Sequence, residues 1–357
     1  MSRLEVRTGA ASYPVLIEAG LIDRAGEVLE PLTGAREKVA LIADASVSAL
    51  HGERLRAALA PLGAVATFDV EPGEASKSRA TAGALWEWMA EAGLHRGDLV
   101  VSFGGGVTSD LAGFAAATFH RGVDVVHVPT TVLGQVDAAI GGKTGIDLPA
   151  GKNLVGSFHH PRAVLSDVDV LATLPDAAFR TGMAEVIKHG LIAAGALLDR
   201  VVAARDALLA RERGTLEEIV TEAARVKVAI VERDEREAGE RAFLNYGHTL
   251  GHALEAHAAY AGRTHGEAVA VGMMFAAHLA REAGLGDRVE LHRAALETYG
   301  LPTTGAGASF DDLLAIMARD KKYDRGLRFV LLEDLGRPVL RGDLGEQALR
   351  AAYDAIR

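Results

Sequence analysis

The first half of the chain alternates short apolar runs, rich in β-branched residues, with longer segments whose apolar residues recur at helical spacing. The short runs predict buried strands at 38–43, 64–70, 98–103, 124–128 and 163–166. Helical patterns lie between them, for example at 78–92 and 109–119. Such alternation is typical of βαβ units. It predicts a Rossmann-like α/β domain with a mostly parallel sheet that helices cover on both faces.

The pattern changes near Pro175, where long stretches rich in Ala, Leu, Glu and Arg replace the β-type runs. Helical spacing extends over 176–198, 215–233, 244–259 and 267–282. One late hairpin is expected from 327–332 and 337–340. A chain of 357 residues suits two cores better than one. We therefore expect an α/β domain over 1–175 and a helical domain over 176–357.

Composition narrows the class of protein. Hydrophobic content of 49% and charged content of 24% are ordinary for a soluble globular protein. The formal net charge of -10 argues against general nucleic-acid binding. The sequence has no cysteine, which excludes disulfides and thiolate catalysis and fits a reducing cytoplasm. It shows no signal-peptide pattern at its N-terminus, and its longest apolar run, 268–280, is too short to cross a bilayer.

Glycine-rich turns in the first half suit a nucleotide. The strand at 98–103 runs directly into Gly104-Gly-Gly-Val-Thr-Ser-Asp110, and a helix follows. Glycines let the backbone approach a pyrophosphate, and a helix N-terminus offers free N–H groups. The spacing is not G-x-G-x-x-G, and a tight turn is the alternative. For Thr130 and Thr131 a turn and a site are equally good interpretations. Asp44 suits either a ribose contact or a helix N-cap.

Two further glycine-rich segments carry lysines. Lys143 lies in 141–145 and Lys152 in 151–153. The G-x-x-x-x-G-K-[ST] frame of a P-loop is absent, which disfavours the use of ATP. Lysines within glycine turns at the ligand edge of a parallel sheet are best explained by an anionic ligand. Asn153, Asp137 and Arg121 are candidates for the same site.

Histidines and a carboxylate in the second half are candidate metal ligands. His248 and His252 are four residues apart, so they share a helix face, and on spacing alone both are candidates. His265 opens the next helical stretch, and antiparallel packing could bring it to the same point as His248. Glu185 lies in an apolar helix, where a carboxylate is costly to bury unless paired or metal-bound. Three nitrogen and oxygen ligands with an open position are typical of catalytic zinc.

These segments together resemble 3-dehydroquinate synthase, a family of sugar-phosphate cyclases. The matching segments follow the family's order at 72–77, 104–110, 121–122, 129–137, 141–145, 151–153, 184–188, 245–255 and 265–268. The resemblance implies NAD⁺ in the α/β domain and Zn²⁺, with Co²⁺ as a substitute, in the helical domain. The implied metal ligands are Glu185, His248 and His265, which makes His252 a residue of the substrate site.

The resemblance also assigns binding residues. The implied NAD⁺ contacts are Asp44, Glu74, Lys77, Gly105, Gly106, Val107, Asp110, Thr130, Thr131, Lys143, Lys152 and Thr173. The implied substrate contacts are Arg121, Asp137, Lys143, Lys152, Asn153, Lys188, Lys227, Arg241, Asn245, His252 and one lysine of the Lys321-Lys322 pair, for which we take Lys321. Among these, Lys143, Asp137, His252, Lys188 and Lys227 are expected to take part in catalysis.

The resemblance implies conversion of 3-deoxy-D-arabino-heptulosonate 7-phosphate to 3-dehydroquinate and phosphate in the shikimate pathway. The expected steps are transient oxidation at C5 by NAD⁺, β-elimination of phosphate, re-reduction, ring opening and aldol closure. A cytoplasmic homodimer is also implied. The alternatives are another sugar-phosphate cyclase, a metal-dependent polyol dehydrogenase of the glycerol dehydrogenase kind, and a non-catalytic nucleotide-binding regulator.

Overall fold

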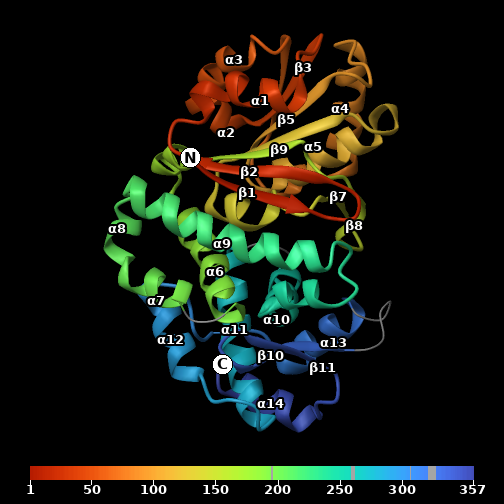
Figure 1. Ribbon diagram of the computed structural model, residues 1–357. Coiled ribbons are helices and arrows are strands. Elements are labelled where there is room, and N and C mark those ends of the chain that lie inside the picture. Colours follow the sequence, from red (N-terminus) through yellow and green to blue (C-terminus); the bar gives the residue numbers. More distant parts are fainter. Residues whose placement is uncertain (194–195, 259–261, 306, 321–326) are drawn as a thin grey trace. The chain divides into compact units, whose positions relative to one another are not determined.

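The computed structural model describes residues 1–193, 196–258, 262–305, 307–320 and 327–357 (Figure 1). The chain forms two compact units. The first contains Met1–Leu174 and Arg211–Glu235, and the second contains Pro175–Ala210 and Arg236–Arg357. No helix within the described residues is both long and apolar enough to span a membrane.

The first unit is built on a seven-stranded sheet. Across the sheet the strands are β1 (Ser2–Arg7), β2 (Ser12–Glu18), β9 (Ala163–Asp167), β6 (Asp124–Pro129), β5 (Leu99–Gly104), β3 (Lys38–Asp44) and β4 (Ala64–Val70). Only β1 pairs antiparallel, with β2, and all other neighbours are parallel. The predicted mostly parallel sheet is confirmed. Strands β1 and β2 were not predicted, because β1 alternates apolar with charged residues and the apolar run of β2 is interrupted near its start by Pro14.

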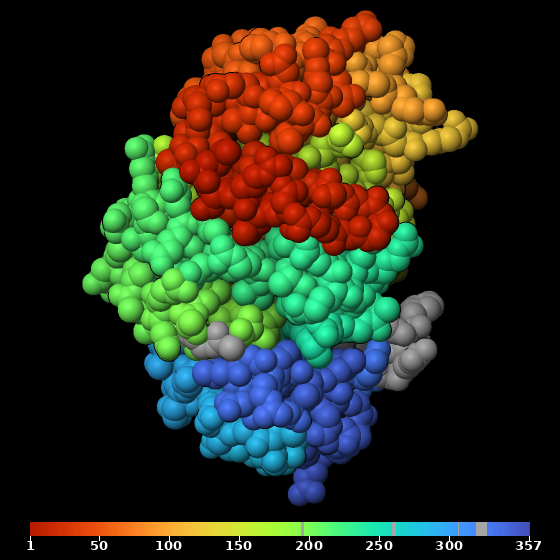
Figure 2. Space-filling view, in the orientation of Figure 1, coloured from red at the N-terminus to blue at the C-terminus, as the bar shows by residue number. Residues whose placement is uncertain are grey.

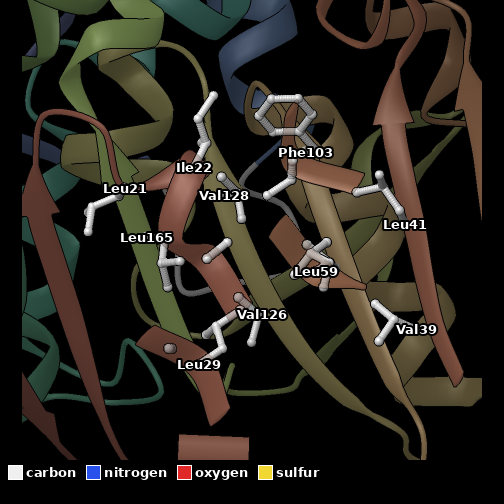
Figure 3. Packing of buried hydrophobic residues seen from close by; sticks show 14 of the residues in the cluster. Leu21, Ile22, Leu29, Val39, Leu41, Leu59, Phe103, Val126, Val128 and Leu165 are labelled. Atoms are coloured by element: carbon white, nitrogen blue, oxygen red, sulfur yellow. The ribbon is translucent and has the colours of Figure 1, made fainter. Parts of the chain in front are cut away.

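Each face of this sheet carries its own hydrophobic core. Val39 and Leu41 of β3 face one core, while Ala40 and Ile42 face the other. The first core includes side chains from α1 (Ala25–Thr33) and α3 (Glu53–Leu59), and Figure 3 shows strand residues packed with Leu29 and Leu59. The second core includes α4 (Arg79–Glu91) and α5 (Gly106–Thr118). Burial on both faces explains why the strands are continuous apolar runs.

The segments read as glycine turns around Lys143 and Lys152 instead form a hairpin, β7 (Lys143–Leu148) with β8 (Gly151–Phe158). This hairpin is a separate two-stranded sheet that packs on α5. A Cβ at Gly145 would lie 2.9 Å from the Val155 carbonyl oxygen on the facing strand. The glycine there permits close approach of two strands rather than a turn, which is why the sequence pattern misled.

A single domain boundary near residue 175 does not describe the chain fully. Helix α9 (Arg213–Arg233) lies in the first unit, where it packs on β1 (Figures 1 and 2, green against red). Glu232 accepts a hydrogen bond from the Arg7 amide at 2.9 Å, and Glu217 accepts one from the Ala19 amide at 2.8 Å. Periodicity reveals that a helix forms, but it carries no information about the sheet on which the helix packs.

The second unit is mostly helical. Its elements are α6 (Asp176–Ile192), α7 (Ala196–Ala203), α8 (Arg205–Leu209), the short η7 (Glu240–Asn245), α10 (His248–His257), α11 (His265–Glu282), α12 (Val289–Thr298), α13 (Phe310–Asp320), α14 (Glu346–Asp354) and the hairpin of β10 (Phe329–Asp334) with β11 (Arg337–Arg341). The expected hairpin is confirmed. The helix expected over 176–198 ends at Ile192, and α7 is a separate helix. Helix α11 is central and packs against α6, α10, α12, α14 and β10.

A buried histidine in the first unit gives a test of stability against pH. Burial, with a contribution from His159, lowers the pKa of His127 to about 3, against about 6.5 in an unfolded chain. The folded protein then binds fewer protons than the unfolded chain in this range, so stability falls as the pH falls below the unfolded value. We expect this residue alone to remove about 1.4 kcal/mol between about pH 7.5 and about pH 5.5.

Urea unfolding of the wild type and His127→Gln at both pH values measures this contribution. Gln retains a hydrogen-bonding group opposite Ser102, whose hydroxyl lies 2.7 Å from the imidazole Nδ1. The variant should lose less stability on acidification than the wild type. Equal losses in the two proteins would contradict a neutral, buried His127.

Candidate metal centre and nucleotide site

Three side chains of the second unit converge on one point. Glu185 lies within α6, His248 is the first residue of α10, and His265 is the first residue of α11. The Nε2 atoms of both histidines lie 3.5 Å from Oε1 of Glu185. One ligand atom from each residue lies within 4.8 Å of the other two. The expected antiparallel packing of the two histidine-bearing helices therefore brings His248 and His265 together with the buried carboxylate.

Glycines allow the three helices to approach closely enough for this convergence. A Cβ at Gly272 of α11 would lie 1.9 Å from the carbonyl oxygen of Gly247, directly before His248. A Cβ at Gly266 would lie 2.3 Å from the Thr181 carbonyl oxygen on α6. Gly247 itself has φ 79°, in the left-handed region that favours glycine. These contacts fix where α10 and α11 begin, and so where their first residues point.

His248 is oriented by the backbone beside it. Its Nδ1–H donates to the Tyr246 carbonyl oxygen at 3.2 Å, which leaves the Nε2 lone pair toward Glu185. The Tyr246 ring is buried, and its hydroxyl donates to Nε2 of His292 at 2.8 Å. His292 in turn donates from Nδ1 to the Arg288 carbonyl oxygen at 2.7 Å. Through Tyr246 and His292, helix α12 thus fixes the backbone just before α10.

His265 is oriented by a carboxylate that the sequence reading did not single out. The backbone start of α11 is fixed by a capping box between Thr264 and Glu267. The imidazole Nδ1–H donates to Oε2 of Glu255 at 3.2 Å. Glu255 is buried in α10. A carboxylate in the Ala/Leu-rich stretch after His252 was the available sequence signal.

The electrostatics of the cluster suit a cation. Burial and the nearby Lys188 ammonium lower the pKa of His248, so its imidazole is neutral. Burial also lowers the pKa of His265, but hydrogen bonds to Glu185 and Glu255 outweigh it and raise the pKa to about 9. A proton is thus favoured where His265 faces Glu185, and a metal ion would displace it. The donor set of two imidazole nitrogens and one carboxylate oxygen fits zinc with an open position.

Four other predicted substrate residues that the structure describes lie in the second unit, and two of them, Lys188 and His252, contact the cluster. Lys188 forms an ion pair with Glu185, and both side chains are fully buried. The His252 ring centroid lies 5.2 Å from that of His248, and His252 is exposed. Arg241 in η7 is buried. Asn245 donates from Nδ2 to Glu237 at 2.6 Å, a contact that the sequence reading also missed.

In the first unit, the predicted nucleotide residues gather where the parallel strands end. A Cβ at Gly104 would lie 3.1 Å from the Asp44 Cβ at the end of β3. A Cβ at Gly105 would lie 3.2 Å from Cγ2 of Thr131, which follows β6. Glycine at the start of α5 therefore keeps the backbone between three strand ends open to a ligand. Asp44 also caps α2 (Ala45–Val47), accepting from the Ser46 amide at 2.9 Å.

Charged residues predicted to bind NAD⁺ form ion pairs beside this edge. Lys77 pairs with Asp110 at 2.6 Å, and Lys152 pairs with Glu74 at 3.3 Å. Burial lowers the pKa of Lys77, but the Asp110 carboxylate outweighs it and the net pKa is raised, so the ammonium stays charged. Asp147 of β7, absent from the predicted set, accepts the Asn153 amide at 2.8 Å.

A buried support holds the turn that precedes Lys143. The Gly141 amide donates to the Tyr13 hydroxyl at 2.9 Å. A Cβ at Gly142, where φ is 68°, would lie 2.8 Å from Nδ1 of His160. His160 bonds through Nε2 to Glu235 at 3.0 Å. No local sequence pattern marks this support, because its members are far apart in the chain.

The remaining predicted residues are placed as follows. Lys227 of α9 forms an ion pair with Asp137 in the short η5 (Gly134–Ala138). Thr173 accepts a hydrogen bond from Nε2 of His51 at 2.8 Å. Arg121 is exposed and follows α5, so it lies roughly 20 Å from Gly105 at the other end of that helix. Lys321 and Lys322 lie outside the described residues.

The amino-acid sequence matches two family models in succession. Residues 67–181 match the model described as 3-dehydroquinate synthase N-terminal, and residues 182–323 match that described as 3-dehydroquinate synthase C-terminal. The curated 3-dehydroquinate synthase of Caulobacter vibrioides is 45% identical, over 97% of this chain and 96% of its own length.

Two solved structures share the fold over nearly the whole chain. The 2-epi-5-epi-valiolone synthase of Streptomyces hygroscopicus, with NAD⁺ and Zn²⁺ bound, has a TM-score of 0.89 at 27% identity and covers 97% of each chain. A 2-deoxy-scyllo-inosose synthase complexed with carbaglucose-6-phosphate, NAD⁺ and Co²⁺ has a TM-score of 0.87 at 26% identity, covering 100% of this chain and 99% of that one. These likenesses confirm the predicted fold class.

The approach of α10 and α11 gives the next testable prediction. Gly272→Ala would place a methyl group against the Gly247 carbonyl oxygen and force the two helices apart. We expect a loss of about 1–3 kcal/mol in unfolding free energy and weaker zinc binding, because Gly247 positions His248. Denaturant unfolding and zinc content of the purified protein measure the two effects.

Gly83→Ala in α4 is the matched control. A Cβ there meets nothing within 4 Å, so this variant should equal the wild type or gain up to about 1 kcal/mol from helix propensity. If Gly272→Ala behaves as the control does, the close approach is not what positions the ligands.

Proposed function

Because the chain belongs to the 3-dehydroquinate synthase family, we propose that it converts 3-deoxy-D-arabino-heptulosonate 7-phosphate into 3-dehydroquinate and phosphate. The observation that carries the proposal is the convergence of Glu185, His248 and His265 in a chain that matches both family models. The enzyme would act in aromatic amino-acid biosynthesis as a phosphate lyase and cyclase.

Two cofactors fit the residues present. Glu185, His248 and His265 supply the donor set for zinc or cobalt, and the glycine-rich ends of the central strands suit NAD⁺. When bound, the metal would make the C5 hydroxyl easier to deprotonate, and NAD⁺ would supply reversible hydride transfer at C5. The proposed NAD⁺ contacts are Asp44, Glu74, Lys77, Gly105, Gly106, Val107, Asp110, Thr130, Thr131, Lys143, Lys152 and Thr173.

The chain's own residues would bind and orient the anionic ends of the substrate. Lys152 and Asn153 are proposed for the phosphate, together with Lys321, whereas Arg121 at the other end of α5 is not placed with them. Arg241 and Lys227 are proposed for the carboxylate, and a buried guanidinium such as that of Arg241 suits a bidentate carboxylate.

Other residues would handle hydroxyl groups and protons. Asp137, Lys143, Lys188 and Asn245 are proposed to contact the substrate. His252 is exposed beside the two histidine ligands, which suits transfer of a proton through water. Phosphate leaves by β-elimination once C5 is a ketone, because the ketone acidifies the neighbouring C6–H.

Relatives with other activities are less similar. The solved cyclases that make valiolone and inosose products are 27% and 26% identical, against 45% for the 3-dehydroquinate synthase relative. A polyol dehydrogenase would release NADH in proportion to substrate, whereas the proposed reaction returns the hydride and releases phosphate. A non-catalytic regulator has no need of the three-ligand cluster.

A phosphate-release assay with the heptulosonate phosphate, with and without NAD⁺ and zinc, tests the proposal. We expect EDTA to abolish turnover, zinc to restore it, and NADH not to accumulate. His248→Ala should lose bound zinc and reduce turnover roughly 100-fold or more, beyond the loss typical for an outer partner of a metal ligand.

His257→Ala is the matched control, because His257 is an exposed histidine on the same helix. It should keep both metal and activity. Stoichiometric NADH release, or phosphate release by the wild type that is indifferent to EDTA, would refute the proposed reaction.

We also infer a homodimer that forms through β8, acting in the cytoplasm, where NAD⁺ and sugar phosphates are retained. Among the described strands β8 pairs only with β7, so one edge of it is open. Leu154, Val155 and Phe158 on this strand are exposed by 56%, 37% and 40%. An open strand edge with large apolar side chains favours pairing with a second copy about a two-fold axis.

The double variant Leu154→Lys/Phe158→Lys should shift the protein from dimer to monomer in sedimentation velocity, because two added charges per chain would face each other across the axis. Leu50→Lys is the control, since Leu50 is an exposed leucine elsewhere on the first unit and should leave the dimer intact. A dimer that survives the double variant would exclude β8 as the interface.

A further inference from the structure

We propose that Glu255 is a positioning residue of the metal centre, which holds the His265 imidazole so that its Nε2 lone pair faces the ion. The inference rests on the metal site of the proposed function and adds to it a residue outside the ligand set. Glu255 would touch neither substrate nor cofactor. It would act only through His265.

The geometry carries this role. Oε2 of Glu255 accepts from Nδ1 of His265 at 3.2 Å, while Nε2 of the same ring lies 3.5 Å from Glu185. The two ring nitrogens thus face two carboxylates on opposite sides. A proton fixed on Nδ1 leaves Nε2 as the ligand atom, because a neutral imidazole carries one proton.

Each of the three ligands has a partner of this kind, and Glu255 completes the set. The His248 ring is held by the Tyr246 carbonyl oxygen at 3.2 Å. Oε2 of Glu185 pairs with Lys188, which leaves Oε1 toward both histidines. Of the two histidines, His265 is the one held by a side chain. Substitution of Glu255 can therefore remove the contact that orients the His265 ring.

The burial of Glu255 supports the same role. Its side chain is only 6% exposed, whereas that of His265 is 30% exposed. A buried carboxylate is costly unless it is compensated. A carboxylate that accepts from a metal-bound histidine also raises the basicity of that ligand, and loss of such a partner typically costs 10–100-fold in metal affinity.

A competing interpretation makes Glu255 a ligand. His252, Glu255 and His265 also offer ligand atoms within 4.8 Å of one another. That set shares His265 with the first set, so both ions would need the same ring, and its Nδ1 would have to lose its proton. His252 is exposed, whereas Glu185 and His248 are buried. The orienting role accounts for the same contact with one ion and a neutral ring.

Zinc affinity, measured by competition with a chromophoric chelator, tests the proposal in wild type, Glu255→Gln and Glu255→Ala. We expect Glu255→Ala to raise the zinc Kd by about 10–100-fold. Glu255→Gln should raise it less, because the amide oxygen still accepts from Nδ1 while the charge is lost. The absorption spectrum of the cobalt-loaded protein should change more in Glu255→Ala than in Glu255→Gln.

Glu282→Gln is the matched control, because Glu282 is an exposed carboxylate at the end of α11. Unfolding of all four proteins in EDTA separates the alternatives. A merely structural role would lower the stability of the metal-free variants and leave the zinc Kd of the folded protein unchanged. That result would overturn the proposal, as would a second zinc equivalent in the wild type that is lost in Glu255→Gln.

The readout does not depend on turnover. If the wild type binds zinc with the predicted dependence on Glu255 but releases no phosphate, the positioning role stands and the proposed function fails. If the wild type releases phosphate and the variants bind zinc as tightly as it does, the proposed function stands and the positioning role fails.

Discussion

The constraint on which the second unit depends is that three helices must begin or pass within reach of one point. Glu185, His248 and His265 come from three separate elements, and their ligand atoms lie within 4.8 Å of one another. Backbones that carry Cβ atoms do not approach so closely, and a methyl group at Gly272 would lie 1.9 Å from a carbonyl oxygen of the facing helix. The glycines at this contact let the helices approach, and that approach brings the histidines beside them to one point. The two residue types therefore serve the same site.

The same convergence places charge where water is excluded. Glu185 and Lys188 are fully buried, and Glu255 is nearly so. Burying isolated charges costs several kcal/mol each, so such a cluster persists only when its members compensate one another. Two carboxylates, one ammonium and two imidazoles leave one negative charge if both rings are neutral. A divalent cation held by Glu185, His248 and His265 would reverse that balance to a single positive charge, and so would favour an alkoxide over an alcohol at the open position.

Much of this could be predicted from sequence, and the parts that could not have physical reasons. The strands of the parallel core were visible because burial on both faces makes them continuous apolar runs. The hairpin at Lys143 was not, because the glycines that let its strands approach look like turn residues. Spacing left His248 and His252 equivalent, and the resemblance to a family separated them. Glu255 was missed because its partner His265 lies on another helix, and no local pattern records a contact between helices.

The lysines proposed to bind anions in the first unit are each paired with a carboxylate. The sequence predicted that lysines bind an anionic ligand, yet in the structure Lys77, Lys152 and Lys227 pair with Asp110, Glu74 and Asp137. The Asp110 carboxylate raises the pKa of Lys77 and so keeps that ammonium charged, and each of the three ion pairs holds its lysine in one place. In the proposed reaction, an incoming phosphate or carboxylate would meet an oriented donor whose desolvation was already compensated during folding. Because each carboxylate competes with an incoming anion for its lysine, one lysine alone would bind an anion weakly. A tightly bound anion would need to contact several of these lysines at once. In the proposed reaction, specificity for a substrate with two anionic ends would follow from that requirement rather than from net positive charge.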